Sequence, residues 1–393
     1  MPIIEFIPPK NIRKHLHRIA RAGLTLGGLV VVYLFVVVAS NMPSHWTSSV
    51  FNPHRLLQES DVVCKGKVQV WLGGVYASIH TLSRIKGDAP DHFIVKYTPN
   101  ALLDLAPGET AILFLKDNLL SYRYAEPHNG KITAVDVTPS KSYGDQPEDR
   151  LLSELVQTAI SGEGPTRYNA IEQIGKLGDP RAKDVLASLC NSDDIAAAGM
   201  SFAARIRVGD APDVDALLAY VKRKRNDAEE ARAVARFRTN GYRLTRLQSE
   251  IFQALDGSVK RDPGDGFTGR FVAFQPRPYR TGPVQKLENF DYVAFFTEAL
   301  KLPSLQTEED MRHVKEDIAR AISSLADKRS LPLVRELMND PDFRVRYTAM
   351  MALVRIFGEG EGPSVDRFRE NESIYRAFWE QKLAAQAGNG ISK

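Results

Sequence analysis

The sequence predicts a multidomain protein with an N-terminal transmembrane helix, a small antiparallel β-barrel and a C-terminal all-α repeat region. Three observations support this fold class. An uncharged apolar run occupies residues 22–39, strand-like runs separated by turn residues fill residues 60–140, and two stretches of the C-terminal half align with each other without gaps. A chain of 393 residues is long enough to bury the cores of two or three domains.

The first predicted element is a transmembrane helix at residues 22–40, preceded by a basic leader at residues 1–21. Its apolar run, AGLTLGGLVVVYLFVVVA, has no charged residue, and about 18 helical residues span about 27 Å, close to the hydrocarbon thickness of a bilayer. Lys and Arg residues are concentrated before the run and nearly absent just after it. The positive-inside rule therefore places the N-terminus in the cytoplasm and the bulk of the chain outside it, as for a bacterial inner-membrane protein facing the periplasm.

A cleaved signal peptide is the alternative interpretation, because Val38, Ala39 and Ser40 resemble a small-residue cleavage site. The basic leader is long, however, and the apolar run exceeds the usual hydrophobic region of a signal peptide, about 7–15 residues. We therefore expect an uncleaved signal anchor, followed by a linker at residues 41–59.

Residues 60–140 contain short runs rich in Val, Ile, Tyr and Phe, separated by residues that favour turns. We expect strands at residues 61–71, 75–85, 92–97, 110–115, 120–124 and 131–137. So many short strands favour a closed barrel, because closure removes exposed strand edges.

Three motifs occur in a fixed order along these strands. They are Ser60-Asp61-Val62-Val63 at the start of the first strand, Ile85-Lys86-Gly87 at the end of the second, and Pro107-Gly108-Glu109 before Ala111-Ile112-Leu113-Phe114-Leu115. This order resembles the OB-like, netrin-type barrel family. The reactive N-terminal cysteine and the disulfides of that family's inhibitors are missing, so protease inhibition is not implied. The resemblance implies a protein contact or a spacer, or a barrel that binds oligonucleotides or oligosaccharides.

An internal repeat is the most informative feature of the C-terminal half. The segment from Ile174 to Arg181 realigns without gaps on the segment from Ile322 to Arg329. The match continues to Asp194, which aligns with Asp342. Each copy predicts a helix, a turn that contains aspartate, a second helix, a second turn, and then the first helix of the next unit.

In the second copy, Asp342 in the turn is followed by Arg346, Ala349 and Leu353 in the next helix. This pattern resembles a HEAT repeat, in which the aspartate caps the helix and the arginine forms a ladder between repeats. The resemblance implies that Asp342 and Arg346 stabilise the repeat, whereas Ala198 replaces the arginine in the first copy. It also implies an α-solenoid over residues 149–380, because one helix pair cannot bury its apolar stripe alone.

Two segments interrupt the repeat. Residues 226–255 predict a long helix with an apolar stripe and many arginines, and residues 257–284 form a loop insertion too rich in Gly and Pro for a helix pair. Long loops inside compact arrays are often functional, although a surface insertion without contacts is the alternative. We assign the candidate partner-binding residues to these segments: Arg232, Arg236, Arg243, Phe267, Phe271, Phe274 and Tyr279.

The run from Lys222 to Arg225 and the arginines that follow it form a basic region. In a cytoplasmic protein it would indicate nucleic acid. The predicted location excludes nucleic acid and leaves an acidic protein face, anionic lipid headgroups or acidic glycans as partners. The alternative is a solvated face with local salt bridges.

Motifs for catalysis, nucleotides and metals are absent: there is no HExxH, clustered Cys/His spacing, Walker A, GxGxxG or GxSxG pattern. Asp262 and Asp265 resemble half of a calcium loop, but the downstream glutamate is missing and a simple turn is favoured. Cys64 and Cys190 fall in different predicted domains, as small buried hydrophobes or as a staple between domains. We expect no metal, no cofactor and no catalytic residues.

These observations predict a membrane-anchored extracytoplasmic scaffold or adaptor that binds a protein partner through its helical repeat surface, and not an enzyme. The first alternative is binding of an anionic envelope polymer or of lipid headgroups by the basic helix and the β domain. The second is an enzyme, because HEAT-like proteins include lyases that act on bound pigments. An enzyme would need a deep pocket with convergent ionisable groups.

Overall fold

The computed structural model describes residues 52–72, 76–96, 105–118, 121–125, 130–223, 244–259, 287–302, 312–359 and 362–389. The chain divides into two units between Ser49 and Val50, and all the described residues belong to the second unit. The expected leader and transmembrane helix, residues 1–40, lie outside them. Among the described residues, no helix combines the length and the hydropathy that a membrane span requires.

Helix α2 (Pro53–Glu59) begins the described chain, inside the expected linker. Its N-cap is Asn52, whose side chain accepts a hydrogen bond from the backbone N–H of Arg55. Proline occupies the first turn, where a missing N–H costs nothing. Leu56 and Leu57 are buried in the main hydrophobic core. This stretch is therefore part of the folded unit and not a linker.

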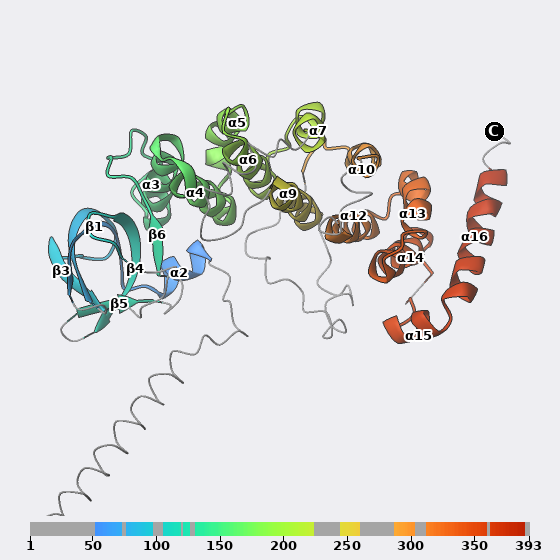
Figure 1. Ribbon diagram of the computed structural model, residues 1–393, viewed down its shortest axis with the longest axis horizontal. Coiled ribbons are helices and arrows are strands. Elements are labelled where there is room, and N and C mark those ends of the chain that lie inside the picture. Colours follow the sequence, from blue (N-terminus) through green and yellow to red (C-terminus); the bar gives the residue numbers. More distant parts are fainter. Residues whose placement is uncertain are drawn as a thin grey trace, which may run out of the picture. The chain divides into compact units, whose positions relative to one another are not determined.

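Within the described part of the chain, the strands overlap the six expected from the sequence. They are β1 (Val62–Leu72), β2 (Tyr76–Lys86), β3 (His92–Lys96), β4 (Thr110–Asn118), β5 (Ser121–Tyr124) and β6 (Lys131–Thr133). Strands β1, β2, β3, β5 and β4 pair in that order, and β4 pairs with β1 to close the ring. Strand β6 pairs with β4. The N-terminal part of the unit is therefore a small five-stranded barrel (Figure 1).

The barrel is mixed, so the expected all-antiparallel arrangement is wrong. Strands β3 and β5 run parallel, with Val95 opposite Tyr122, whereas the other pairs of the ring are antiparallel. The reason is geometric. Alternating strand directions can close a ring only when the number of strands is even, so a ring of five strands must contain a parallel pair.

Strand β4 has apolar residues on both faces. Leu113 and Leu115 pack in the core of the barrel, whereas Ile112 and Phe114 pack in the core that the barrel shares with helix α3 (Pro147–Ser161). A strand buried on both sides has a continuous apolar run instead of an alternating pattern. One wall of the barrel is thus covered by helices.

The helical region continues from α3 to the end of the described chain. Its helices are α4 (Gly164–Leu177), α5 (Lys183–Cys190), α6 (Ile195–Arg207), α7 (Val214–Lys222), α9 (Leu244–Ser258), α10 (Tyr292–Leu300), α12 (Arg312–Leu325), α13 (Leu331–Leu337), α14 (Phe343–Phe357), α15 (Val365–Glu370) and α16 (Glu372–Asn389). The long helices α4, α6, α9, α12 and α14 pack each against the next. Figure 1 shows the shorter helices α5, α7, α10 and α13 along one side of this row.

The two copies of the internal repeat have the same structure. Helix α4 corresponds to α12, α5 to α13 and α6 to α14, and a short 3₁₀ helix stands in the first turn of each copy. In each turn an aspartate accepts a hydrogen bond from a backbone N–H two residues later. Asp179 accepts from Arg181 (2.9 Å) and Asp327 from Arg329 (2.8 Å).

Helix α9 covers the C-terminal part of the long helix expected at residues 226–255 and continues through Ser258. The first two residues of the expected loop insertion are therefore helical. The Ser258 hydroxyl donates to the carbonyl of Leu255 (2.8 Å) and lies 2.7 Å from the Tyr292 hydroxyl, which ties the end of α9 to α10. Residues 224–243 and 260–286 lie outside the described residues.

Candidate functional site

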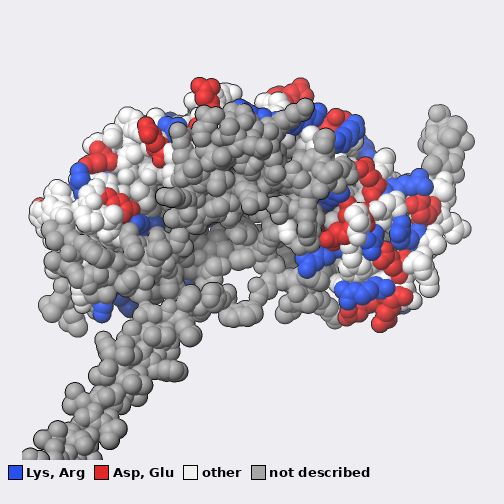
Figure 2. Space-filling view, in the orientation of Figure 1, with Lys and Arg blue, Asp and Glu red and all other residues white. Residues whose placement is uncertain are grey.

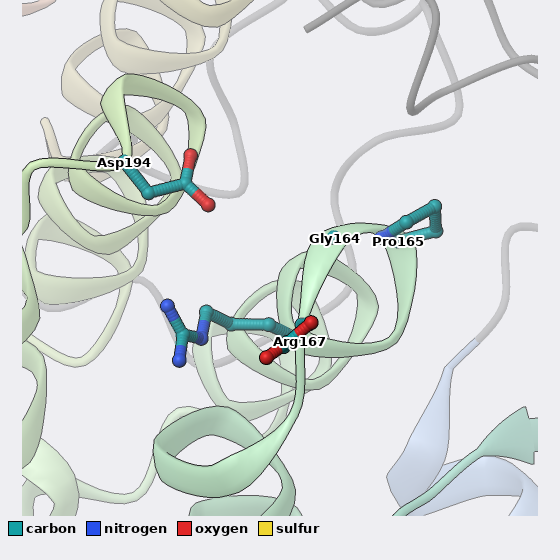
Figure 3. A pocket seen from close by; sticks show the side chains of 5 residues that line it. Gly164, Pro165, Arg167 and Asp194 are labelled. Carbon is teal, nitrogen blue, oxygen red and sulfur yellow. The ribbon is translucent and has the colours of Figure 1, made fainter.

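A surface pocket of about 540 Å³ lies where helices α4 and α6 begin. It is lined by Glu163, Gly164, Pro165, Arg167 and Asp194. Figure 3 shows the guanidinium of Arg167 and the carboxylate of Asp194 pointing towards one another from the two helices. The pocket therefore brings a cation and an anion to the same surface depression.

The start of α4 is shaped by its first residues. Gly164 has a φ of 51°, a left-handed conformation that glycine adopts without steric cost, and Pro165 follows it in the first turn. Glu163 occupies the N-cap position, but its side chain makes no capping hydrogen bond. The start of α4 therefore lines the pocket without a cap from the Glu163 side chain, and the helix dipole places partial positive charge there.

Asp194 is engaged within the chain. One carboxylate oxygen accepts hydrogen bonds from the backbone N–H groups of Ala196 (3.0 Å) and Ala197 (3.3 Å), which caps α6. The other oxygen accepts from the hydroxyl of Tyr168 on α4 (2.6 Å). Asp194 thus joins the starts of two successive long helices, and its role in the pocket is structural.

Arg167 keeps donor capacity for a ligand. Its Nη2 donates to the carbonyl of Ile160 (3.2 Å), but its buried Nε has no hydrogen-bond partner in the described chain. Buried N–H groups are nearly always paired, and a guanidinium matches the two oxygens of a carboxylate. The guanidinium of Arg167 is therefore the cationic group in the lining of the pocket, beside the carboxylates of Glu163 and Asp194.

Several charged side chains elsewhere in the helical region form ion pairs between different helices. Examples are Arg207 with Glu250 (2.6 Å) between α6 and α9, and Arg335 with Glu380 (2.8 Å) between α13 and α16. Figure 2 shows Lys and Arg interspersed with Asp and Glu on the face in view. This part of the surface has mixed charge.

Arginines in the repeat turns also connect neighbouring elements. Arg181 donates to Asp179 in its own turn and to Asp149 in the first turn of α3 (2.6 Å). Arg329 takes the same place in the second copy and donates to Asp291 at the start of α10 (3.0 Å). The hydrogen bond from Arg181 holds the pKa of Asp179 below its usual range. The turns therefore fix the spacing of the stack.

Asp342 and Arg346, the residues assigned to repeat stabilisation, lie at the start of α14. Asp342 is the N-cap and accepts a hydrogen bond from the backbone N–H of Arg344 (2.7 Å). Arg346 binds both carboxylate oxygens of Glu372 at the start of α16 (2.6 and 3.1 Å) and donates to the carbonyl of Asp340 (3.0 Å). The hydrogen bond from Arg346 lowers the pKa of Glu372.

The predicted partner-binding residues all fall outside the part of the chain that the structure describes. They are Arg232, Arg236, Arg243, Phe267, Phe271, Phe274 and Tyr279.

The residues of the pocket were not predicted from the sequence. Asp194 could have been found, because it aligns with Asp342 in the repeat. Arg167 could not, because an arginine in the first turn of a helix is usually solvated.

The outer face of β2 and β3 is a second exposed surface. His80 lies opposite His92, and their rings stack with centroids 4.7 Å apart. Tyr76 and Ile94 are exposed beside them. Among the described residues, no three His, Cys, Asp or Glu side chains lie close enough to hold a metal ion. This barrel face is partly aromatic and offers a contact surface.

Residues 166–192 match the family described as PBS lyase HEAT-like repeat. The matched segment covers most of α4, all of α5 and the turn between them. A sequence search of curated proteins finds no match to the chain. The resemblance to HEAT repeats is thus confirmed: the chain contains a HEAT-like repeat in its helical C-terminal region and a five-stranded barrel in its N-terminal part.

Proposed function

We propose that this protein is a membrane-anchored extracytoplasmic scaffold that binds a protein partner through its stacked helices, and that it is not an enzyme. The observation that carries the proposal is the HEAT-like stack, in which α4, α6, α9, α12 and α14 pack in sequence. HEAT-like repeats are generally protein-binding scaffolds, because stacked helix pairs expose an extended surface. We expect residues 149–380 to form an α-solenoid that exposes this surface to the partner.

The pocket between α4 and α6 is the first contact that we assign to this partner. The guanidinium of Arg167 in the pocket lining favours a carboxylate, whereas Asp194 is already engaged by Tyr168 and by the start of α6. The mixed charge around the helices favours an ordered protein contact over general attraction to a polyanion. The ligand group is therefore an Asp or Glu side chain of the partner.

The anchor is the second part of the proposal. The uncharged run at residues 22–39 and the basic leader before it support an uncleaved helix in a bacterial inner membrane, with the N-terminus in the cytoplasm. The described unit begins at residue 52, shortly after this run. We therefore expect the scaffold to act at the periplasmic surface of the membrane.

Site-specific photocrosslinking of the full-length protein in native membranes tests the partner surface. A photoreactive residue is placed at Glu163, which is exposed at the pocket rim, and at Glu336, which is equally classed as exposed on α13 and serves as the matched control. We expect one recurrent protein adduct from position 163 and not from position 336. Identical adducts from both positions would contradict the pocket as the specific contact, and only lipid or glycan adducts would contradict a protein partner.

Membrane anchorage is tested separately. The full-length protein should remain in the membrane pellet after alkaline extraction, and protease added to spheroplasts should degrade the barrel and the helices. Release by alkali, or protection of the folded unit until the membrane is lysed, would contradict the anchor or its orientation.

A further inference from the structure

Two histidines lie side by side on the outer face of the barrel. His80 on β2 is directly opposite His92 on β3 in an antiparallel pair. Residues opposite each other in such a pair share one face of the sheet, with Cβ atoms about 4.5–5.5 Å apart. The centroids of the two imidazole rings are 4.7 Å apart. His80 is partly exposed and His92 is exposed, so an ion in solution can reach both rings.

The hydrogen bond of His80 sets the tautomer of its ring. Its Nδ1 lies 3.2 Å from the carbonyl oxygen of Asp91, the residue before His92. A carbonyl oxygen only accepts, so Nδ1 carries the proton and Nε2 of the neutral ring carries the lone pair. Histidines that bind metal ions almost always donate their other ring N–H in this way, because the hydrogen bond fixes the tautomer and the orientation of the ring. His80 therefore has the arrangement of a metal ligand that binds through Nε2.

The separation of the rings fits two nitrogens on one metal ion. An imidazole nitrogen binds such an ion at about 2.0–2.1 Å, which places the centroid of its ring about 3.2 Å from the ion. Two such centroids are about 4.5 Å apart when the nitrogens subtend a right angle at the metal, and about 5.2 Å apart when the angle is tetrahedral. The observed 4.7 Å lies between these values. Side-chain rotation is therefore sufficient to bring both rings onto one ion, and the pairing of the strands is unchanged.

The positive charges near the pair are offset within the chain. Lys67 is the residue opposite His80 on β1, and its ammonium binds the carboxylate of Asp136 (2.6 Å). Arg84, further along β2, binds the carboxylate of Asp91 (2.5 Å). Each of these cations has a carboxylate beside it, which reduces the repulsion that a bound metal ion would meet.

We propose that His80 and His92 form a two-histidine site for a late first-row divalent metal ion, with Cu²⁺ bound most tightly. Imidazole suits Zn²⁺, Ni²⁺ and Cu²⁺, and the affinity of nitrogen sites for these ions is greatest for Cu²⁺. Among the described residues, no third His, Cys, Asp or Glu side chain lies close enough to complete a three-ligand set. Water, or a ligand from another molecule, takes the remaining positions.

The expectation that the chain binds no metal rested on the absence of local motifs. Such motifs do not reveal this pair, because its two ligands meet only when β2 pairs with β3. The site lies on the barrel, so this inference does not depend on the partner proposed for the helical region.

Isothermal titration of the full-length, untagged protein in detergent with Cu²⁺ measures the affinity. Glycine is added as a competing ligand, so that single histidines elsewhere in the chain bind little metal. His80→Asn and His92→Asn should each raise the dissociation constant of the tightest site by about tenfold or more, because the second imidazole then no longer binds at high effective concentration. The double variant should bind no more weakly than either single variant, because the chelate is lost with the first ligand.

Lys96→Gln is the matched control, because Lys96 is an exposed residue of β3 that is not a metal ligand. Its dissociation constant should equal that of the wild type. Unchanged affinity in either histidine variant, an equal loss in Lys96→Gln, or losses that add in the double variant overturn the proposal.

Electron paramagnetic resonance of the wild-type protein with substoichiometric Cu²⁺ identifies the ligands and does not depend on the folding of any variant. The spectrum should show hyperfine coupling to two imidazole nitrogens, and each single variant should lose this signature. A wild-type spectrum without this coupling overturns the proposal. A double variant that reproduces the wild-type spectrum also overturns it, because the ion is then held elsewhere in the chain.

Discussion

Lys65 on strand β1 and Glu154 on helix α3 form an ion pair that is buried between the barrel and the helices. The Nζ–Oε2 distance is 2.6 Å, and the side chains are 3% and 5% exposed. Lys65 also donates to the carbonyl of Val137, and Ser83 on β2 donates to the second oxygen of Glu154. This network fixes the barrel on the first helix of the helical region, so that the two parts meet at one defined interface.

Removing one partner of this pair should be costly. Lys65→Met leaves the Glu154 carboxylate buried without a cation, and we expect the free energy of unfolding to fall by about 3–5 kcal/mol. The double variant Lys65→Met/Glu154→Leu should recover most of this loss, because no uncompensated charge remains. Urea denaturation of the three proteins measures the effect. A single variant as stable as the wild type would show that the pair is solvated.

Alanine substitutions at two glycines in long helices should change the stability of the protein in opposite directions. A Cβ at Gly199 on α6 would lie 2.0 Å from the hydroxyl oxygen of Tyr220, so Gly199→Ala should destabilise the protein by about 1–3 kcal/mol. A Cβ at Gly257 on α9 would meet nothing within 4 Å, so Gly257→Ala should stabilise by about 0.5–1 kcal/mol. Thermal unfolding of both variants checks the sign of each effect. A Gly199→Ala variant as stable as the wild type or more stable would contradict the packing of Tyr220 on α6, and a destabilised Gly257→Ala would contradict the open surroundings of Gly257.

Acid should weaken the contact between α14 and α16. Arg346 lowers the pKa of Glu372 in the folded protein by its hydrogen bonds, so the pair stabilises above the unfolded pKa of about 4.3. That contribution is lost as the pH falls through the folded pKa. Arg346→Gln should therefore be less stable than the wild type at pH 7, and the difference should shrink towards pH 3.

The control for this measurement is Lys328→Gln, which removes an exposed positive charge from the turn before α13. Its stability difference from the wild type should be small and should vary little between pH 7 and pH 3. Denaturant titrations at several pH values give both comparisons. A constant difference for Arg346→Gln would show that Glu372 is not stabilised by this arginine.

The two cysteines should be unreactive in the folded protein. Burial raises the pKa of Cys64 in the barrel to about 12 and that of Cys190 on α5 to about 11, so almost no thiolate is present at pH 7.5. We expect slow labelling by a thiol reagent in native protein and two labelled thiols after denaturation. Both are free in the structure, so a staple between domains is not formed. Rapid native labelling of Cys64 would contradict its position in the barrel core.

Arg167 should affect binding more than stability. Arg167→Gln removes one hydrogen bond to a carbonyl and a guanidinium nitrogen that has no partner, so the free energy of unfolding should change by about 1 kcal/mol or less. Capture of the partner identified by crosslinking should weaken by about tenfold. Lys183→Gln, an exposed cation on α5, is the control and should bind as the wild type does. Equal binding by both variants would remove the pocket from the partner surface.

The strand positions could be predicted because turn residues and apolar spacing are local signals. The run from Ala111 to Leu115 identified β4, and its continuous apolar character reflects burial on both faces. The parallel pairing of β3 with β5 was not predicted, because pairing joins residues distant in sequence and follows from closing a ring of five strands. Helix α2 was missed for a similar reason, since Leu56 and Leu57 are buried by helices that follow much later.

The sequence by itself determined the repeat. The aligned aspartates Asp179 and Asp327 occupy equivalent turns, because a capping side chain acts on backbone groups two residues away. Only the tertiary structure decided that Lys65 pairs with Glu154 and that Arg167 and Asp194 line the same pocket. It also decided that Ile374 and Phe378 on α16 are exposed. Those arrangements depend on contacts between distant segments, which a local pattern does not encode. Capping and periodicity act within one or two turns of chain, whereas pockets and interfaces form only where separate elements pack together.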